Sequence, residues 1–207
     1  MKIRQMNTSP LLVATLMIAA TLLAVPSGAT DSETAIATRA AGWFWCIEAD
    51  LEKVEGIISV TSGYTGGSVA NPTYKQVSAG ETGHTEAVRV VFDPRVISFE
   101  QLLEIFWHNI DPTVADRQFC DLGEQYRAGI FYHDEGQREA AERSRAVLDQ
   151  TKSFAKPIVT EITAATAFYP AEAYHQDYSK KNPIRYSYYR KRCGRDRRLK
   201  ELWGEEK

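Results

Sequence analysis

A cysteine within a run of aromatic residues has the clearest chemical potential in this sequence. The run Ala-Gly-Trp-Phe-Trp-Cys-Ile-Glu covers residues 41–48 and contains Cys46. Small residues precede the aromatic residues and good helix formers follow them, which predicts a strand, a tight turn and the first turn of a helix. A helix N-terminus stabilises an anion, and the thiolate is the reactive form of cysteine. Cys46 is therefore a candidate nucleophile, and the alternative is an inert thiol buried at a strand–helix junction.

Cys120 and Cys193 are the other two cysteines. No two of the three form a Cys-x-x-Cys pair, and no His/Cys cluster has zinc spacing, so we expect no metal. Three widely spaced cysteines favour thiol redox chemistry over a disulfide framework.

The N-terminal segment has the pattern of a secretory signal peptide. Two basic residues precede an apolar run over residues 11–25, and Ser27 and Ala29 supply the small residues that a signal peptidase reads. A transmembrane anchor is the alternative, but the run falls short of the roughly 20 residues that span a bilayer. We predict that residues 1–29 are removed, which leaves an exported, periplasmic protein without stable membrane association.

Residues 30–207 are long enough for a single domain with a substantial core. The whole chain has 25 basic and 27 acidic residues, and removal of Lys2 and Arg4 leaves 23 against 27, a formal charge of −4. This acidic balance argues against a nucleic-acid partner.

Hydrophobic periodicity and turn residues predict the elements that position these groups. Strands are expected over residues 35–40, 56–63, 87–92, 126–133 and 157–165, and helices over residues 44–54, 98–110, 135–152 and 197–202. The first six elements follow the order β-α-β-β-α-β. That order predicts an α/β (α+β) domain with a ferredoxin-like, split β-α-β core and helices over one face of a mixed sheet.

Two long segments without strong periodicity, residues 64–83 and 113–125, are predicted to be functional loops. Both must converge on the N-terminus of the first helix if they contribute to one site. The chain from Phe168 onward is aromatic and basic, and we expect an irregular C-terminal tail.

Six short motifs are spread along the chain. They are Gly-Trp-Phe-Trp-Cys-Ile-Glu at 42–48, Gly-Tyr-Thr-Gly-Gly at 63–67, Gly-His-Thr-Glu-Ala at 83–87, Phe-Cys-Asp-Leu-Gly-Glu-Gln-Tyr-Arg at 119–127, Tyr-His-Gln-Asp-Tyr at 174–178 and Cys-Gly-Arg-Asp at 193–196. Together and in this order they resemble the peptide methionine sulfoxide reductases of type A, over roughly residues 36–204. The resemblance implies reduction of the S epimer of methionine sulfoxide, free or in proteins. It implies no bound cofactor and a thioredoxin-like dithiol donor as partner, and we expect a monomer.

The sequence departs from the family at the position of its nucleophile. The family pattern is Gly-Cys-Phe-Trp, and this chain has Trp43 in place of that cysteine. Cys46 follows three residues later, about 60° around a helix and roughly 4.5 Å along its axis. Cys46 is the candidate to replace the missing thiol. One alternative is a relative that binds methionine sulfoxide without reducing it, and another is a reductase for a different oxidised small molecule.

The resemblance also implies roles for other residues. Glu86 would protonate the departing oxygen, because burial among aromatic rings would raise its pKa; otherwise it is a solvated acid at a strand start. Tyr64 and Tyr126 would hold that oxygen through their hydroxyls, or they are half-buried aromatic residues. Phe44 and Trp45 would form the apolar wall against the substrate methyl group, or they belong to the core.

The remaining assignments concern the two loops and the tail. Asp121 would help to order the site, and His175 would lie near the pocket, although a structural hydrogen bond is the simpler role for His175. A sulfenic acid on the nucleophile would condense with a second thiol to a disulfide. Cys193 is the natural resolving residue and Cys120 the alternative, and the thioredoxin-like donor would then reduce the disulfide.

Overall fold

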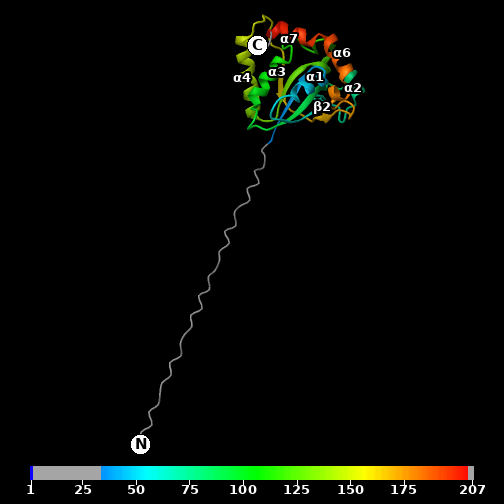
Figure 1. The fold of residues 1–207 in the computed structure, drawn as a ribbon. Coiled ribbons are helices and arrows are strands. Elements are labelled where there is room, and N and C mark those ends of the chain that lie inside the picture. Colours follow the sequence, from blue (N-terminus) through cyan, green and yellow to red (C-terminus); the bar gives the residue numbers. More distant parts are fainter. Residues whose placement is uncertain (2–33, 205–207) are drawn as a thin grey trace. The chain divides into compact units, whose positions relative to one another are not determined.

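A six-stranded mixed sheet forms the centre of the protein in the computed structural model, which describes residues 34–204 together with Met1 (Figure 1). Residues 2–29 of the predicted signal peptide lie outside the described residues. None of the helices within residues 34–204 has the length and apolar character that crossing a bilayer requires.

The sheet confirms the predicted ferredoxin-like core. Its strands are β1 (Ala35–Ala41), β2 (Ile57–Thr65), β3 (Thr85–Phe92), β6 (Ala128–Tyr132), β7 (Glu161–Ala164) and β8 (Tyr169–Pro170), in the order β7-β6-β1-β3-β2-β8. Helices α1 (Phe44–Leu51) and α3 (Phe99–His108) complete the order β-α-β-β-α-β, with β1, β2, β3 and β6 as its strands. Only the β6–β7 pair is parallel among the paired strands of this sheet in the described residues, so the sheet is mixed.

Helices α1 and α3 cover one face of the sheet. Side chains alternate along a strand, so Ala37 and Ala41 of β1 point to the opposite face from Ala40. Ala37 and Ala41 belong to the main core with apolar residues of both helices, while Ala40 packs with Ala87 and Phe131 in a smaller cluster. The helices are thereby fixed against the strands that carry the candidate site.

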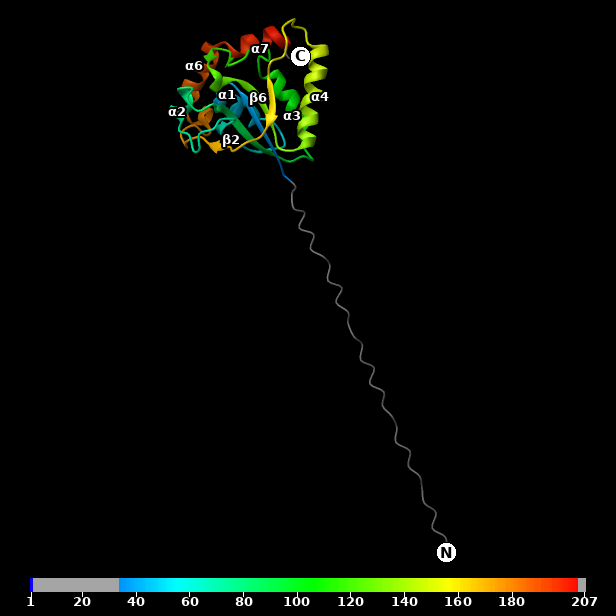
Figure 2. The same ribbon diagram turned by 180° about the vertical axis from the view of Figure 1, so that it is seen from behind.

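Local capping signals set where two helices begin. The Ser98 hydroxyl accepts the Gln101 N–H and the Gln101 side chain accepts the Ser98 N–H, so the predicted capping box at α3 is confirmed. Helix α4 (Glu135–Thr151) begins after Asp134, whose side chain accepts the Gln137 N–H. Helix α4 lies against α3 and the β6–β7 edge of the sheet (Figure 2).

The segments predicted to be irregular contain regular structure. The first predicted loop includes α2 (Tyr74–Ser78), and the second includes β4 (Arg117–Gln118), β5 (Asp121–Leu122) and the 3₁₀ helix η1 (Glu124–Tyr126). The prediction of an irregular tail is wrong, because the tail forms α5 (Tyr178–Lys181), α6 (Pro183–Cys193) and α7 (Arg195–Trp203). Only the short helix predicted over residues 197–202 is confirmed, within α7. Pro183 is in the first turn of α6, and Gly194, at φ 72°, separates α6 from α7. Figure 1 shows these last two helices in orange and red, next to one another.

Candidate active site

The turn between β1 and α1 places the aromatic run at the site. Gly42 has φ +80°, and a Cβ there would lie 2.6 Å from the Gln118 Cβ, so only glycine fits. Trp43 follows at the N-cap, and Cys46 lies in the first turn of α1, as predicted.

Trp43 fills the space between three other aromatic side chains. Its ring centroid lies 4.9 Å from that of Trp45, 6.1 Å from Tyr126 and 4.6 Å from Tyr189. The indole N–H is buried and has no hydrogen-bond partner among the described residues. A bulky ring, in contact with Trp45 of the predicted apolar wall and with the predicted oxygen-binding Tyr126, therefore occupies the position at which the resemblance implies a nucleophile.

Glu86, on β3, is a fully buried acid whose carboxyl group reaches the start of α1. Its Oε2 accepts the Phe44 N–H at 3.1 Å, and its Oε1 is buried without a partner among the described residues. Burial raises the pKa of Glu86 well above its ordinary value, against the opposing effect of the Phe44 N–H. The predicted rise in pKa is confirmed, and the protonated acid has a free oxygen from which to donate.

The predicted oxygen-binding tyrosines flank Glu86 in different ways. Tyr64 is paired with Glu86 across β2 and β3, but its hydroxyl donates to Glu172 Oε2 at 2.8 Å. Tyr126 is buried behind Trp43, and burial raises its pKa. Both hydroxyls therefore stay protonated, and Glu172 holds that of Tyr64.

His175 makes the structural hydrogen bond that its simpler role predicts. Its Nδ1 accepts the Trp45 indole N–H at 3.1 Å, which leaves the ring proton on Nε2 when the imidazole is neutral. The His175 ring also lies 5.0 Å from the Phe44 ring. Burial lowers the pKa of His175, so the neutral form is favoured and the ring fixes the orientation of Trp45.

Cys46 is a free thiol that is 2% exposed. The prediction that the helix N-terminus lowers its pKa is wrong. Burial raises the pKa of Cys46, and the charges of Arg195 and Arg190 oppose this only in part. In this conformation the thiol is not poised as a thiolate.

The other two cysteines form a disulfide with one another. Cys120, at the turn of the β4–β5 hairpin, and Cys193, the last residue of α6, have Cα atoms 5.0 Å apart. Cys193 thus lies at a helix end and not in a flexible tail, and the two predicted resolving residues are paired with each other. Because both sulfurs are bonded, neither is available as the thiolate ligand that a metal at Cys120, Asp121 and Cys193 would require.

Asp121 lies beside this disulfide and is 8% exposed. Its Oδ2 accepts the Tyr189 hydroxyl, and burial raises its pKa to about 6. Asp121 also contributes to the raised pKa of Glu86, so the disulfide and the buried acid belong to one electrostatic cluster. The second predicted loop therefore meets the N-terminus of α1, and the first reaches it through Tyr64, whose ring centroid lies 6.0 Å from that of Phe44, so the two loops converge as expected.

Three site residues, Tyr74, Glu172 and Tyr189, were not predicted. Tyr189 precedes Cys193 by four residues, so helical spacing would have placed the two side chains on one face. Glu172 and Tyr74 left no comparable signal, because the Glu172 carboxylate reaches the Tyr74 N–H and the Tyr64 hydroxyl only after folding.

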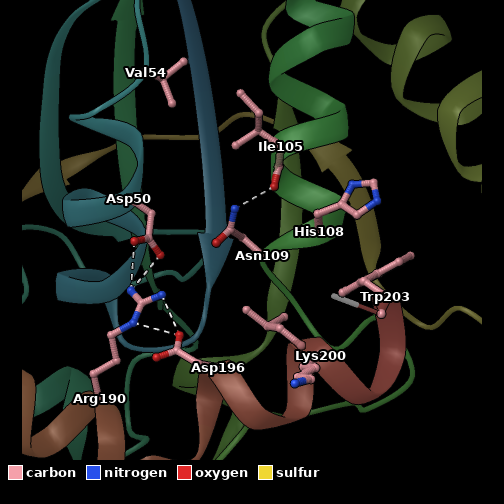
Figure 3. A pocket seen from close by; sticks show the side chains of 11 residues that line it. Asp50, Val54, Ile105, His108, Asn109, Arg190, Asp196, Lys200 and Trp203 are labelled. Carbon is pink, nitrogen blue, oxygen red and sulfur yellow. Dashed lines mark hydrogen bonds and ion pairs between the residues drawn. The ribbon is translucent and has the colours of Figure 1, made fainter. Parts of the chain in front are cut away.

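A cleft of about 710 Å³ lies between α1, α3, α6 and α7, and none of the predicted site residues lines it. Figure 3 shows the Arg190 guanidinium between the carboxylates of Asp50 and Asp196 on the wall of this cleft. These ion pairs fasten α6 to α1 and α7. The arrangement supports the position of Tyr189 and Cys193, and we assign it a structural role.

Comparisons with known proteins agree with the geometry. The family described as "Peptide methionine sulfoxide reductase" matches residues 35–207. "Peptide methionine sulfoxide reductase MsrA" of Bacillus licheniformis is 50% identical over 171 residues, which are 83% of this chain and 94% of that protein. "Peptide methionine sulfoxide reductase MsrA/MsrB" of Vibrio cholerae is 52% identical over 83% of this chain, which spans only 45% of that longer relative. The reduced form of Mxr1 from Saccharomyces cerevisiae superposes with a TM-score of 0.70 at 30% identity, over 74% of this chain and 88% of Mxr1.

Proposed function

Because the chain belongs to the peptide methionine sulfoxide reductase family, we propose that it reduces methionine-S-sulfoxide, free or in proteins, to methionine. In this reaction one sulfoxide and two thiols give one sulfide, one disulfide and water. The protein needs an acid for the departing oxygen, a sulfur nucleophile and a second thiol, and it binds no cofactor in this scheme.

The proposal rests mainly on the burial and the unpartnered oxygen of Glu86. Burial raises the pKa of Glu86 and so favours the protonated acid, and its Oε1 has no partner among the described residues. A sulfoxide oxygen that hydrogen-bonds to Glu86 would receive this proton as the S–O bond breaks. The neighbouring Phe44 and Trp45 rings supply an apolar wall for the methyl group.

Cys46 is the proposed nucleophile, since it is the free thiol of the chain and lies in the first turn of the helix whose Phe44 N–H holds Glu86. Attack on the sulfoxide sulfur leaves a sulfenic acid on Cys46, and condensation with the reduced Cys193 releases water and forms a disulfide. Exchange with Cys120 then yields the Cys120–Cys193 pair. A thioredoxin-like dithiol donor reduces that pair through the exposed Cys120.

A second candidate function is binding of methionine sulfoxide without reduction. Trp43 replaces the nucleophile of the family, and the thiol of Cys46 is buried with a raised pKa. A relative with these two features could retain the Glu86 hydrogen bond and lack turnover.

Methionine release distinguishes the two functions. Reduced protein is incubated with dithiothreitol and methionine-S-sulfoxide, with the R epimer as the control, and methionine is quantified by chromatography. We expect methionine from the S epimer alone, no release by Cys46→Ser, and a single turnover by Cys193→Ser. Trp43→Cys restores the residue of the family; if this variant releases methionine and wild type does not, the protein is a binder and the reductase proposal fails.

We further propose that the protein acts as a monomer outside the cytoplasm.

 The signal-peptide pattern of residues 1–29 supports export, and oxidised proteins of the periplasm would be its substrates. Disulfides persist in that compartment, which agrees with a Cys120–Cys193 pair in the resting protein.

A further inference from the structure

The Cys120–Cys193 disulfide is built asymmetrically. Cys120 is exposed at the tip of the β4–β5 hairpin, whereas Cys193 is half-buried at the end of α6. The Cys120 N–H points at the Cys193 sulfur, with 3.2 Å between nitrogen and Sγ. An incoming thiolate therefore reaches Cys120 more easily, and the N–H stabilises negative charge on Cys193 as that sulfur leaves.

Asp121 contacts both sulfurs. Its Oδ1 lies 3.5 Å from Cys120 Sγ, and its Oδ2 lies 3.8 Å from Cys193 Sγ. A disulfide has no S–H, so a hydrogen bond across either contact requires a proton on Asp121. Once the pair is reduced, the direction reverses, and a thiol can donate to the carboxylate.

We propose that Asp121 is the proton donor for thiol–disulfide exchange at Cys120–Cys193, which makes this pair an exchange centre for dithiols that does not depend on a thiol at Trp43. The inference concerns the step that regenerates the protein, which is reduction of the Cys120–Cys193 disulfide by a dithiol donor. Only the biological role of this step rests on the proposed function. Exchange can be measured without any sulfoxide, so failure of either proposal is a separate result.

The exchange proceeds in two balanced steps. A donor thiolate attacks Cys120 Sγ and forms a mixed disulfide, the Cys120–Cys193 bond breaks, and its electron pair leaves on Cys193 Sγ. Asp121 transfers its proton to that sulfur and becomes a carboxylate. The second thiol of the donor then attacks the donor sulfur of the mixed disulfide, releases Cys120 and passes its proton to it. The donor is oxidised to a disulfide, and the protein gains two thiols.

The surroundings of Asp121 allow its proton to be present well above the pH at which an ordinary aspartate loses it. The titratable and charged groups that face it are Tyr189 and Cys193 on α6, Arg195 on α7, Glu86 on β3, Cys46 on α1, Tyr74 on α2 and Tyr126 on η1. Burial raises the pKa of Asp121 to about 6, while the Tyr189 hydroxyl and the charge of Arg195 act in the opposite direction. Loss of the Tyr189 hydroxyl should therefore raise this pKa further.

The test measures reduction of the oxidised protein by dithiothreitol, with the dithiothreitol thiolate held at one concentration from pH 5.5 to 8.5. Samples are quenched in acid, unfolded, alkylated with iodoacetamide and weighed by mass spectrometry. The oxidised chain carries one adduct, on Cys46, and the reduced chain carries three. For wild type we expect the rate constant to fall roughly tenfold per pH unit above about pH 6, until uncatalysed exchange sets a floor.

Three variants complete the test. Asp121→Asn should react roughly 10²-fold more slowly at pH 6 and lose the pH dependence. Tyr189→Phe should move the decline to higher pH, which a purely structural role for Asp121 does not predict. Asp116→Asn removes an exposed carboxylate from the same hairpin region and should match wild type. The proposal is overturned if Asp121→Asn keeps the wild-type pH profile. Should that variant fail to fold, the proposal is overturned if Tyr189→Phe does not change the pH at which the rate constant declines.

Discussion

Arg39, in the central strand β1, carries a charge inside the core. Its side chain is 2% exposed, and Nη1 and Nη2 have no hydrogen-bond partner among the described residues. The guanidinium lies over the rings of Phe99 and Phe106, 4.7 and 5.5 Å from their centroids. We predict that Arg39→Met, which keeps the length of the side chain and removes the charge, stabilises the protein.

The size of the effect follows from the pKa of Arg39. Burial lowers this pKa to about 9, from an ordinary value near 12.5. At about 1.36 kcal/mol per pH unit, the charged folded state is disfavoured by roughly 4–5 kcal/mol. Contacts with the two rings return about 1 kcal/mol each. The net gain of Arg39→Met in the free energy of unfolding is therefore about 2–3 kcal/mol, or a rise in Tm of roughly 5–10 °C.

Urea denaturation at pH 7, followed by tryptophan fluorescence, measures the gain. Arg145→Met is the matched control, because it removes the same charge from an exposed position on α4 and should change stability by less than about 0.5 kcal/mol. The folded protein releases the Arg39 proton at a lower pH than the unfolded chain, so wild-type stability should rise above pH 9 and the gap to Arg39→Met should narrow. Equal or lower stability of Arg39→Met at pH 7 would refute the reasoning, because the charge would then have a compensating partner.

Two further predictions concern the acid and the N-terminus. Glu86→Gln should slow methionine release by roughly 10²–10⁴-fold, measured in wild type or, if that is inactive, in Trp43→Cys. The rate of the parent protein should decline as the pH rises through the raised pKa of Glu86, and Glu86→Gln should lack this decline. Near-normal turnover by Glu86→Gln would show that Glu86 has only a structural role. Exported protein should begin near Thr30 in N-terminal sequencing, and an exported product that begins at Met1 would contradict the signal peptide.

The core elements could be predicted because their signals are local. The Ser98 and Gln101 capping box and the apolar period of α3 gave the helix its start and its buried face. Helix α4 was predicted within one residue at its C-terminal end for the same reason. The short element α2 was missed although Thr73 and Gln76 form a capping box there, because five residues are too few for a period to be recognised.

The site could be predicted only in part, because several roles depend on what surrounds a side chain. The raised pKa of Glu86 follows from its place on a buried strand beside aromatic residues, and both features can be read from the sequence. The pKa of Cys46 depends on two opposing effects, the helix N-terminus and burial, and the sequence does not give the degree of burial. With the thiol 2% exposed, burial has the larger effect.

The pairing of Cys120 with Cys193 depends on the basic tail, which was expected to be irregular. Arg195 is 2% exposed, donates to the carbonyl oxygens of Ala41 and Asn109, and lies 4.6 Å from the Phe119 ring centroid. Arg190 anchors the preceding helix to α1 in a similar way. In sequence such arginines cannot be told from solvated charges, because three of their acceptors, two backbone oxygens and the acid Asp50, lie more than 80 residues away. These two arginines hold α6 and α7 against the loop that carries Cys120. The Cys120–Cys193 disulfide, which accepts electrons from the donor, therefore depends on the segment that was expected to be irregular.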